Sequence, residues 1–328
     1  MIFGMVDNAL LSLVKVAIPA STVVVLCALG VMLAERVGVL NLGQEGLIGI
    51  GAVYAVIAAT EWGVGSPWIS MLIGMVAAAA AGAIFAVVVV VFRANQVLAG
   101  LALAIGGIGL SNQLGVNRNG TPIRTLFAEI NPGGRFTSNA FLETFFFHDP
   151  VVYVAYILLP AAFWFLLFRT RHGMNMKAVG ENPASADAAG VNVTWARIGY
   201  SVAGASLAGA GGAYMVLTFT PMWAPDIARG RGWIALAVVI FGAWRPFRVV
   251  AGALLYGAMI SLGMTAQARN WNLPFLGPRD LSFFLSMIPY LVTIVAILIP
   301  AGAARFGHRV RSTSAPGGLA VPYSREER

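Results

Sequence analysis

The sequence has little charge and almost no cysteine. Of its 328 residues, only 10% are Asp, Glu, Lys or Arg, while 59% are hydrophobic. Ordinary soluble domains have about 25% charged and about 45–50% apolar residues. This composition excludes a water-soluble globule.

Few residues are available for catalysis or metal binding. The single cysteine, Cys27, lies in an apolar run and excludes both an intrachain disulfide and a cysteine-based metal site. His148, His172 and His308 lie more than 20 residues apart, so none has a metal-ligand spacing. The sequence therefore disfavours a metalloenzyme.

Lys and Arg outnumber Asp and Glu by 21 to 13. The basic residues lie in ones and twos between long apolar runs, without the basic face that a nucleic-acid-binding protein needs. We interpret them as flanks of membrane segments and expect no nucleic-acid partner.

A helix crosses a bilayer with about 20 mainly apolar residues. Charge-free runs of that length occur at residues 16–34, 62–92, 94–117, 150–168, 198–225, 249–268 and 281–304. An eighth run, 37–60, contains only Glu45, and a ninth, 232–244, is too short for a full helical crossing. The runs predict an all-α polytopic membrane protein with about nine transmembrane helices (about eight to ten), two of them interrupted by glycines.

Lys and Arg concentrate on the cytoplasmic side of membrane proteins. Nine crossings with the N-terminus outside place 13 of the 21 basic residues inside, whereas a re-entrant 232–244 segment would turn the basic tail outward. We therefore expect residues 1–304 to form the transmembrane domain, with an extracytoplasmic loop at 115–149 and a cytoplasmic loop at 169–197. Residues 305–328 are expected to form a disordered cytoplasmic tail.

Polar residues in two of the apolar runs are candidates for the substrate pathway. Asn41, Gln44 and Glu45 lie among glycines at an interruption of the run 37–60, and Asn95 and Gln96 lie at the start of the run 94–117. Acids at membrane depth are often functional. Alternatively, Glu45 stabilises the N-terminus of the half-helix 46–59 through free N–H groups and the helix dipole.

The second interruption is the glycine-rich stretch 229–232, which leads into 233–241. One such segment in each half of a chain points to a transporter of two structural repeats, with broken helices at their interface.

The loop 169–197 contains a short helix with recognisable ends. Asn182 is suited to the N-cap, Pro183 to the first helical position and Gly190 to the left-handed residue after the helix. A capped helix in so long a loop indicates a docking element.

Three stretches resemble a known family: ERVGVLNLGQEGLIGIGA at 35–52, AVGENPASADAAGV at 178–191 and GWIALAVVIFGAW at 232–244. They resemble bacterial ABC-importer permeases for branched-chain amino acids, ribose-type sugars and nucleosides, and are most similar to the nucleoside branch. The resemblance implies a multi-pass protein of the bacterial cytoplasmic membrane that works with a second permease, a cytoplasmic ABC ATPase that binds ATP and Mg, and an extracytoplasmic substrate-binding protein. It also implies that the capped helix couples to the ATPase, through Glu181, Asn182, Pro183, Ala184, Ser185, Ala186, Asp187, Ala188, Ala189 and Gly190.

The chain itself has no phosphate-binding loop, because neither Lys15 nor Lys177 follows a glycine. We therefore expect a transport subunit that has no cofactor and no ATPase of its own, carrying a neutral, hydrogen-bonding cargo such as a nucleoside. Ribose-type sugars and branched-chain amino acids remain alternatives. An ion-coupled secondary transporter is a further alternative, which the near absence of acids in the apolar runs disfavours.

Overall fold

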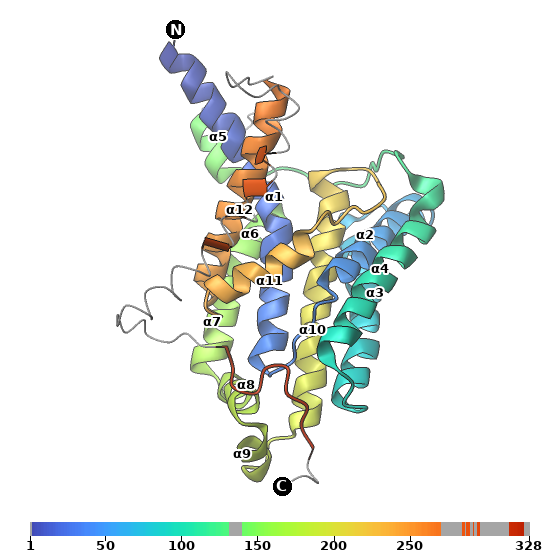
Figure 1. Cartoon of the computed structure of the whole chain (residues 1–328). Coiled ribbons are helices and arrows are strands. Elements are labelled where there is room, and N and C mark those ends of the chain that lie inside the picture. The colour runs from blue at the N-terminus through green and yellow to red at the C-terminus, as the bar shows by residue number, and fades with distance from the viewer. Residues whose placement is uncertain are drawn as a thin grey trace.

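The computed structural model of the chain describes residues 2–130, 140–269 and 315–324, with short helical stretches between 284 and 295. Throughout these residues the regular elements are helices, which confirms the all-α prediction (Figure 1). The first half contains α1 (Ile2–Arg36), α2 (Gln44–Thr60), α3 (Pro67–Val90), α4 (Gln96–Gly115), the 3₁₀ turn η1 (Val116–Arg118) and α5 (Ala140–Phe146). The second half contains α6 (Pro150–Tyr153), η3 (Val154–Leu158), α7 (Leu159–Arg169), α8 (Arg171–Glu181), α9 (Pro183–Ala188), α10 (Val193–Tyr214), η4 (Met215–Phe219), α11 (Arg231–Phe241) and α12 (Pro246–Ala268).

Six helical stretches in the described residues are long and apolar enough to cross a membrane: Leu11–Arg36, Pro67–Val90, Gln96–Arg118, Pro150–Arg169, Val193–Phe219 and Pro246–Ala268. The chain is thus a multi-pass α-helical membrane protein. The two interrupted runs form shorter helices, the 17-residue α2 and the 11-residue α11. Most of the predicted span 281–304 lies outside the described residues.

Two helices form the centre of the bundle. The apolar window of α1 is 83% buried and that of α10 is 67% buried, compared with 22% for α4. Gly30 on α1 and Gly204 on α10 allow these two helices to touch, since a Cβ on either glycine would collide with the carbonyl oxygen of the other. The glycines of 204–212 thus serve helix packing.

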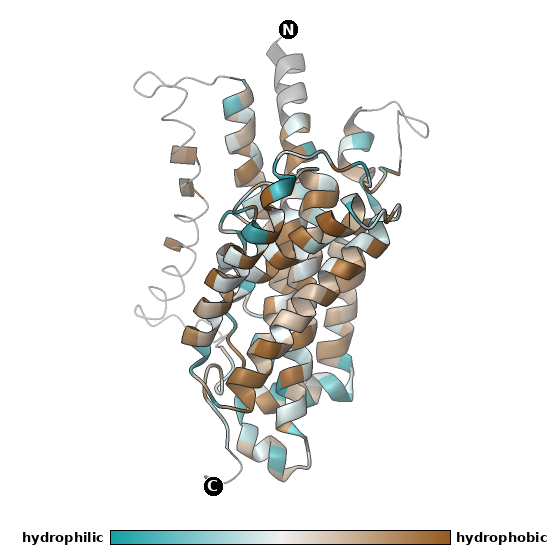
Figure 2. Ribbon diagram, turned by 90° about the vertical axis from the view of Figure 1, so that its right-hand side faces the viewer, coloured by the Kyte–Doolittle hydropathy of each residue, from teal (hydrophilic) through white to brown (hydrophobic). Residues whose placement is uncertain are grey.

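The outer helices present apolar side chains to their surroundings. Ile84 on α3 and Ile105 on α4 are 70% and 72% exposed. Figure 2 shows hydrophobic residues along the helices and hydrophilic ones mainly at the two ends of the bundle. This distribution suits helices that face lipid or another membrane subunit.

The span Pro150–Arg169 changes helix type along its length. It begins at α6, where Asp149 accepts hydrogen bonds from Val151 N (3.0 Å) and Val152 N (3.3 Å). The π-helical turn η3 follows and ends shortly before Pro160. Proline has no N–H to continue an α-helical ladder, which gives a physical reason for the wider turn.

The loop 169–197 is more structured than the sequence predicts. Besides the expected short helix, now α9, it forms the 11-residue α8, which the sequence analysis missed. Thr170 caps α8 by accepting a hydrogen bond from Gly173 N (3.2 Å). Both helices lie at the end of the bundle opposite α5 (Figure 1).

The prediction of a disordered tail is wrong for residues 315–324. These residues run along α8 and α9 (Figure 1), and Gly318 N donates to Gly180 O (2.7 Å). The charged and polar residues on either side of this segment suggested disorder, but backbone hydrogen bonds to neighbouring elements hold residues 315–324 in place.

Candidate functional site

The candidate site is built around residues 37–43, the linker between α1 and α2. Its backbone is irregular, and the first turn of α2 begins beside it at Gln44. Asn41 Oδ1 accepts a hydrogen bond from Gly43 N (2.8 Å), which forms a tight turn. Gln44 Nε2 donates to Asn41 O (3.4 Å), and its Oε1 accepts from Cys27 Sγ (3.6 Å). Asn41 and Gln44 are both buried.

Glu45 joins the two interrupted segments. Its Oε1 accepts a hydrogen bond from Gly230 N (2.5 Å), and its Oε2 accepts one from Gly232 N (2.8 Å). The carboxylate therefore caps the N-terminus of α11, where free N–H groups and the helix dipole favour a negative charge. The hydrogen bonds of Glu45 go to the start of α11, a helix end that the sequence analysis did not consider, while Glu45 also lies in the first turn of its own helix, α2.

The backbone at the start of α11 requires glycines. Gly230 has φ = 82°, a left-handed conformation that L side chains rarely adopt. A Cβ on Gly232 would collide with the backbone nitrogen of Glu45. The two glycines thus allow direct contact between the broken segments of the two halves.

The chain just after α11 is bound to the C-terminal end of α1, next to the linker. Trp244 Nε1 donates to Glu35 Oε2 (2.6 Å), and Arg36 Nη2 donates to Trp244 O (2.6 Å). Ala243 and Trp244 have φ angles of 54° and 52°, so the chain reverses sharply here. The sequence analysis did not single out this cluster, although all its members lie in the stretches that carry the family resemblance.

The remaining polar candidates also bind the protein backbone. Gln96 Oε1 accepts from Leu40 N (2.7 Å), and Gln96 is buried. Asn95 is an exposed N-cap that accepts from Val97 N (2.9 Å) and Leu98 N (3.1 Å). The structure thus gathers four of the five candidates at the linker and leaves Asn95 at the start of α4. Their contact with cargo stays a prediction.

Arg231 is a buried cation that the sequence analysis did not place in the pathway. Its Nη1 donates to Ala228 O (3.2 Å) and Ile227 O (3.5 Å), and its guanidinium lies 5.6 Å from the Phe219 ring centre. Its position between two glycines, Gly230 and Gly232, was the available signal. The contacts place it within the loop that leads into α11.

The second candidate site is α9. Asn182 Oδ1 accepts from Ser185 N (3.0 Å), Pro183 occupies the first turn, and Gly190 has φ = 86°. These features confirm the predicted helix and its ends. Ala186 is buried, whereas Ala184, Ser185, Ala188 and Ala189 are exposed. Only one side of the helix is therefore available to a partner.

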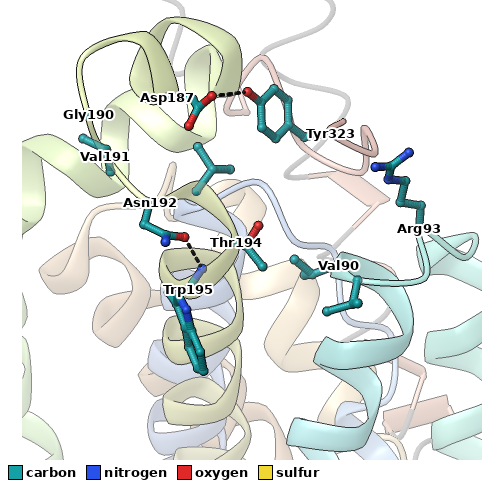
Figure 3. Close-up of a pocket in the computed structure, with 11 residues that line it drawn as sticks. Val90, Arg93, Asp187, Gly190, Val191, Asn192, Thr194, Trp195 and Tyr323 are labelled. Atoms are coloured by element: carbon teal, nitrogen blue, oxygen red, sulfur yellow. Dashed lines mark hydrogen bonds between the residues drawn. The ribbon is translucent and has the colours of Figure 1, made fainter. Parts of the chain in front are cut away.

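A cavity of about 430 Å³ lies beside α9. Its walls come from the ends of α3 and α9, the start of α10 and the C-terminal segment (Figure 3). Asp187 and Tyr323 form a hydrogen bond of 3.0 Å at its edge. Arg93, Trp195 and Val90 are among the other lining residues.

A second cavity, of about 340 Å³, lies at the opposite end of the bundle beside Asp149 and His148. Tyr214 Oη donates to Asp149 Oδ2 (2.8 Å). Burial raises the pKa of Asp149 above its ordinary value, against the opposing effect of this hydrogen bond, and lowers the pKa of His148. Lys15 and Glu143 lie 3.9 Å apart at the same cavity.

Known proteins resemble this chain over nearly its whole length. Residues 13–304 match the family described as the permease component of branched-chain amino acid transport systems. A Haloferax volcanii protein named as a candidate glucose ABC transporter permease, TsgC13, is 34% identical over 96% of this chain and 98% of its own length. The guanosine ABC transporter permease NupQ of Bacillus subtilis is 31% identical over 97% of this chain and 99% of its own length. The nucleoside ABC transporter permease NupC of Lactococcus lactis is 30% identical over 91% of this chain and 95% of its own length.

No solved structure matches the chain. The family assignment therefore rests on sequence, and the helical architecture described above agrees with it. Both the family match and the full-length relatives include the linker, α9 and α11. The chain belongs to the family of permease components of branched-chain amino acid transport systems and is a transmembrane permease subunit of an ABC transporter.

Proposed function

We propose that this permease imports nucleosides across the cytoplasmic membrane of a bacterium. It works with a second permease subunit, an extracytoplasmic substrate-binding protein and a cytoplasmic ATPase that binds ATP and Mg. The observation that carries the cargo assignment is the similarity to guanosine and nucleoside permeases over more than nine-tenths of the chain.

The buried charges support a neutral cargo. Among the described residues, Glu45, Glu35, Arg231 and Arg197 are buried and bind groups of the protein itself. A phosphorylated or strongly acidic cargo needs fixed cations along its route. A nucleoside needs hydrogen-bonding groups and apolar surface, which amides and small apolar side chains supply.

The ends of the described segments support an odd number of crossings. Arg269 contacts Ser12 Oγ (3.5 Å) near the start of the span Leu11–Arg36, whereas Ala320 N donates to Gly38 O (3.2 Å) just beyond the end of that span. Ser12 and Gly38 are 26 positions apart, about 39 Å along the helix axis at 1.5 Å per residue. Nine crossings, with the N-terminus outside and α9 in the cytoplasm, fit this arrangement and the distribution of basic residues.

We assign ATPase docking to the exposed side of α9. Ala184, Ser185, Ala188 and Ala189 are exposed and have small side chains, so a groove on a partner can enclose this side of the helix. The opposite side is anchored through the buried Ala186. A docked partner can therefore move α9, which lies outside the transmembrane core.

Gene deletion tests the cargo. Uptake of labelled guanosine, adenosine and uridine should be lost in a strain that lacks this gene and restored by a plasmid copy. Glucose, ribose and leucine are measured in parallel, since one relative is named for glucose. If nucleoside uptake is spared and uptake of one of these three is lost, the nucleoside assignment is wrong while the permease assignment stands.

A further inference from the structure

The C-terminal segment 315–324, here called the strap, is attached to the loop that carries α9. Gly318 N donates to Gly180 O (2.7 Å) at the end of α8, and Gly317 N donates to Glu181 Oε2 (3.1 Å). Tyr323 Oη donates to Asp187 Oδ2 (3.0 Å) within α9 itself (Figure 3). The strap therefore contacts both helices of this loop.

The strap is also attached to the linker between α1 and α2. Ala320 N donates to Gly38 O (3.2 Å). Arg197, which is 2% exposed, donates from Nε to Val37 O (3.2 Å) and from Nη1 to Val321 O (3.0 Å). One buried guanidinium thus joins the strap to the start of the linker.

The backbone of the strap packs tightly against the backbones of the linker and of α8. A Cβ on Gly38 would lie 2.8 Å from Gly318 O, and a Cβ on Gly318 would lie 2.9 Å from Gly180 O. Both distances are shorter than real Cβ contacts, so glycine at these positions allows the three backbones to approach. Pro316 and Gly318 are buried here.

The residues of α9 themselves hold this helix to the rest of the protein less firmly than the strap is held. The helix has six residues, and Ala186 is the buried one among them. An alanine methyl group supplies little apolar area to hold a helix against a push. The strap adds a hydrogen bond to α9 and a continuous covalent connection from it to the linker contacts.

We propose that the strap transmits movement of α9 to the α1–α2 linker, with Tyr323 as a positioning residue. This inference rests on the proposed docking of the ATPase at α9. From Tyr323 the path runs through Val321 and Arg197 to Val37, at the start of the linker. At the other end of that linker, Glu45 holds the start of α11. The strap is thereby part of the ATPase-coupling machinery and not a passive tail.

The test measures ATP hydrolysed per molecule of labelled guanosine transported, in vesicles that contain the whole transporter. If the deletion strain identifies a different cargo, that cargo is used. Tyr323→Phe removes the hydroxyl that binds Asp187 and should raise the ratio about threefold while the assembled complex still hydrolyses ATP. A chain ending at Ser314 should raise the ratio more. Asp187→Asn keeps an oxygen acceptor for Tyr323 and should stay close to wild type.

Tyr200→Phe is the matched control, because the described residues give its hydroxyl no hydrogen bond and its ratio should not change. A wild-type ratio for Tyr323→Phe overturns the role of the strap, and this holds even if the shortened chain fails to accumulate. Ala188→Arg separates the two proposals. If it abolishes uptake while Tyr323→Phe has no effect, only the strap inference fails; if neither has an effect, docking at α9 fails as well.

Discussion

Glu45 shows how one side chain links distant parts of the chain. It lies at the start of α2, yet its two carboxylate oxygens bind backbone N–H groups of Gly230 and Gly232. Glu45 is buried, and so is its hydrogen bond with Gly232, whereas the bond with Gly230 is partly buried. An acid at this position is explained by the helix end that it caps, without any need to contact cargo.

Replacing Glu45 by Gln tests this role. Gln keeps the shape but loses the charge, and its amide NH₂ would face an N–H donor. We expect a loss of about 1–2 kcal/mol in stability, with uptake per folded molecule nearly unchanged. Thermal unfolding in detergent and uptake normalised to folded protein measure the two effects. Glu61→Gln, at a half-exposed surface ion pair with Arg118, should change stability by less than about 1 kcal/mol. Loss of uptake with unchanged stability would place Glu45 on the substrate route.

Gly232→Ala tests the contact from the other side. The new Cβ would collide with the backbone nitrogen of Glu45, so α11 would have to move and the cap would weaken. We expect a loss of at least about 1–3 kcal/mol, as for other overpacked sites. Gly199→Ala on α10 is the control, because its Cβ would meet nothing within 4 Å. That change should be neutral or stabilise the helix by up to about 1 kcal/mol. Equal stability of the two variants would show that the contact is not formed.

The sequence indicated some residues of the site but not their partners. Asn41, Gln44 and Glu45 were visible as polar residues between glycines in an apolar run. The contacts of Glu45 with Gly230 and Gly232, 185 and 187 positions away, could not be inferred, because nothing local specifies which helix end an acid will cap. Arg197 was counted as a membrane flank, although in the structure it is buried against the linker and the strap.

At the scale of elements, the sequence predicted α9 in detail and missed α8. Asn182, Pro183 and Gly190 have strong local preferences that define both ends of α9. By contrast, α8 has a mixed polar sequence and is stabilised largely by packing of residues such as Met176 and Val179 against the bundle. Local signals can specify helix ends, whereas tertiary packing decides whether a weak helix forms.

The exposed side of α9 provides the next prediction. Ala188→Arg places a long, charged side chain on the proposed docking surface and should abolish uptake with normal accumulation and folding. Ala188→Ser keeps the residue small and should retain uptake. Ala186→Arg, in contrast, should lower accumulation, since it forces a charge into a buried position. Uptake at the wild-type level in Ala188→Arg would show that the ATPase does not dock there.

Asp149, at the N-terminal end of α6, should make the stability of the protein depend on pH. Burial raises the pKa of Asp149 in the folded state. Its contribution to stability is therefore fully present below the ordinary pKa of Asp, about 3.9, and is lost as pH rises through the folded value. Asn can also cap a helix but does not titrate in this range. Between about pH 4 and pH 8, thermal stability of the wild type should fall relative to Asp149→Asn; a constant difference would contradict the shift.

At the scale of the whole molecule, apolar runs identified the membrane helices well. All six candidate spans overlap predicted runs, because length and hydropathy are sufficient for a helix that must satisfy its own backbone. The broken segments were detected through their glycines, but their meeting at Glu45 depends on the fold. The strap was missed because it is a short stretch between charged and polar residues, and because its contacts are with backbone groups of distant elements, which no local pattern specifies.

Energy source is the property that most directly separates an ABC permease from an ion-coupled carrier. The decisive measurement is uptake of labelled guanosine into vesicles that contain this chain, its partner permease, the ATPase and the binding protein, with all ion gradients collapsed. We predict that guanosine accumulates only when ATP is supplied on the side of the membrane that carries the ATPase. Accumulation should stop when the ATPase is omitted. Accumulation driven by a proton or sodium gradient, by this chain without ATP, would contradict the account.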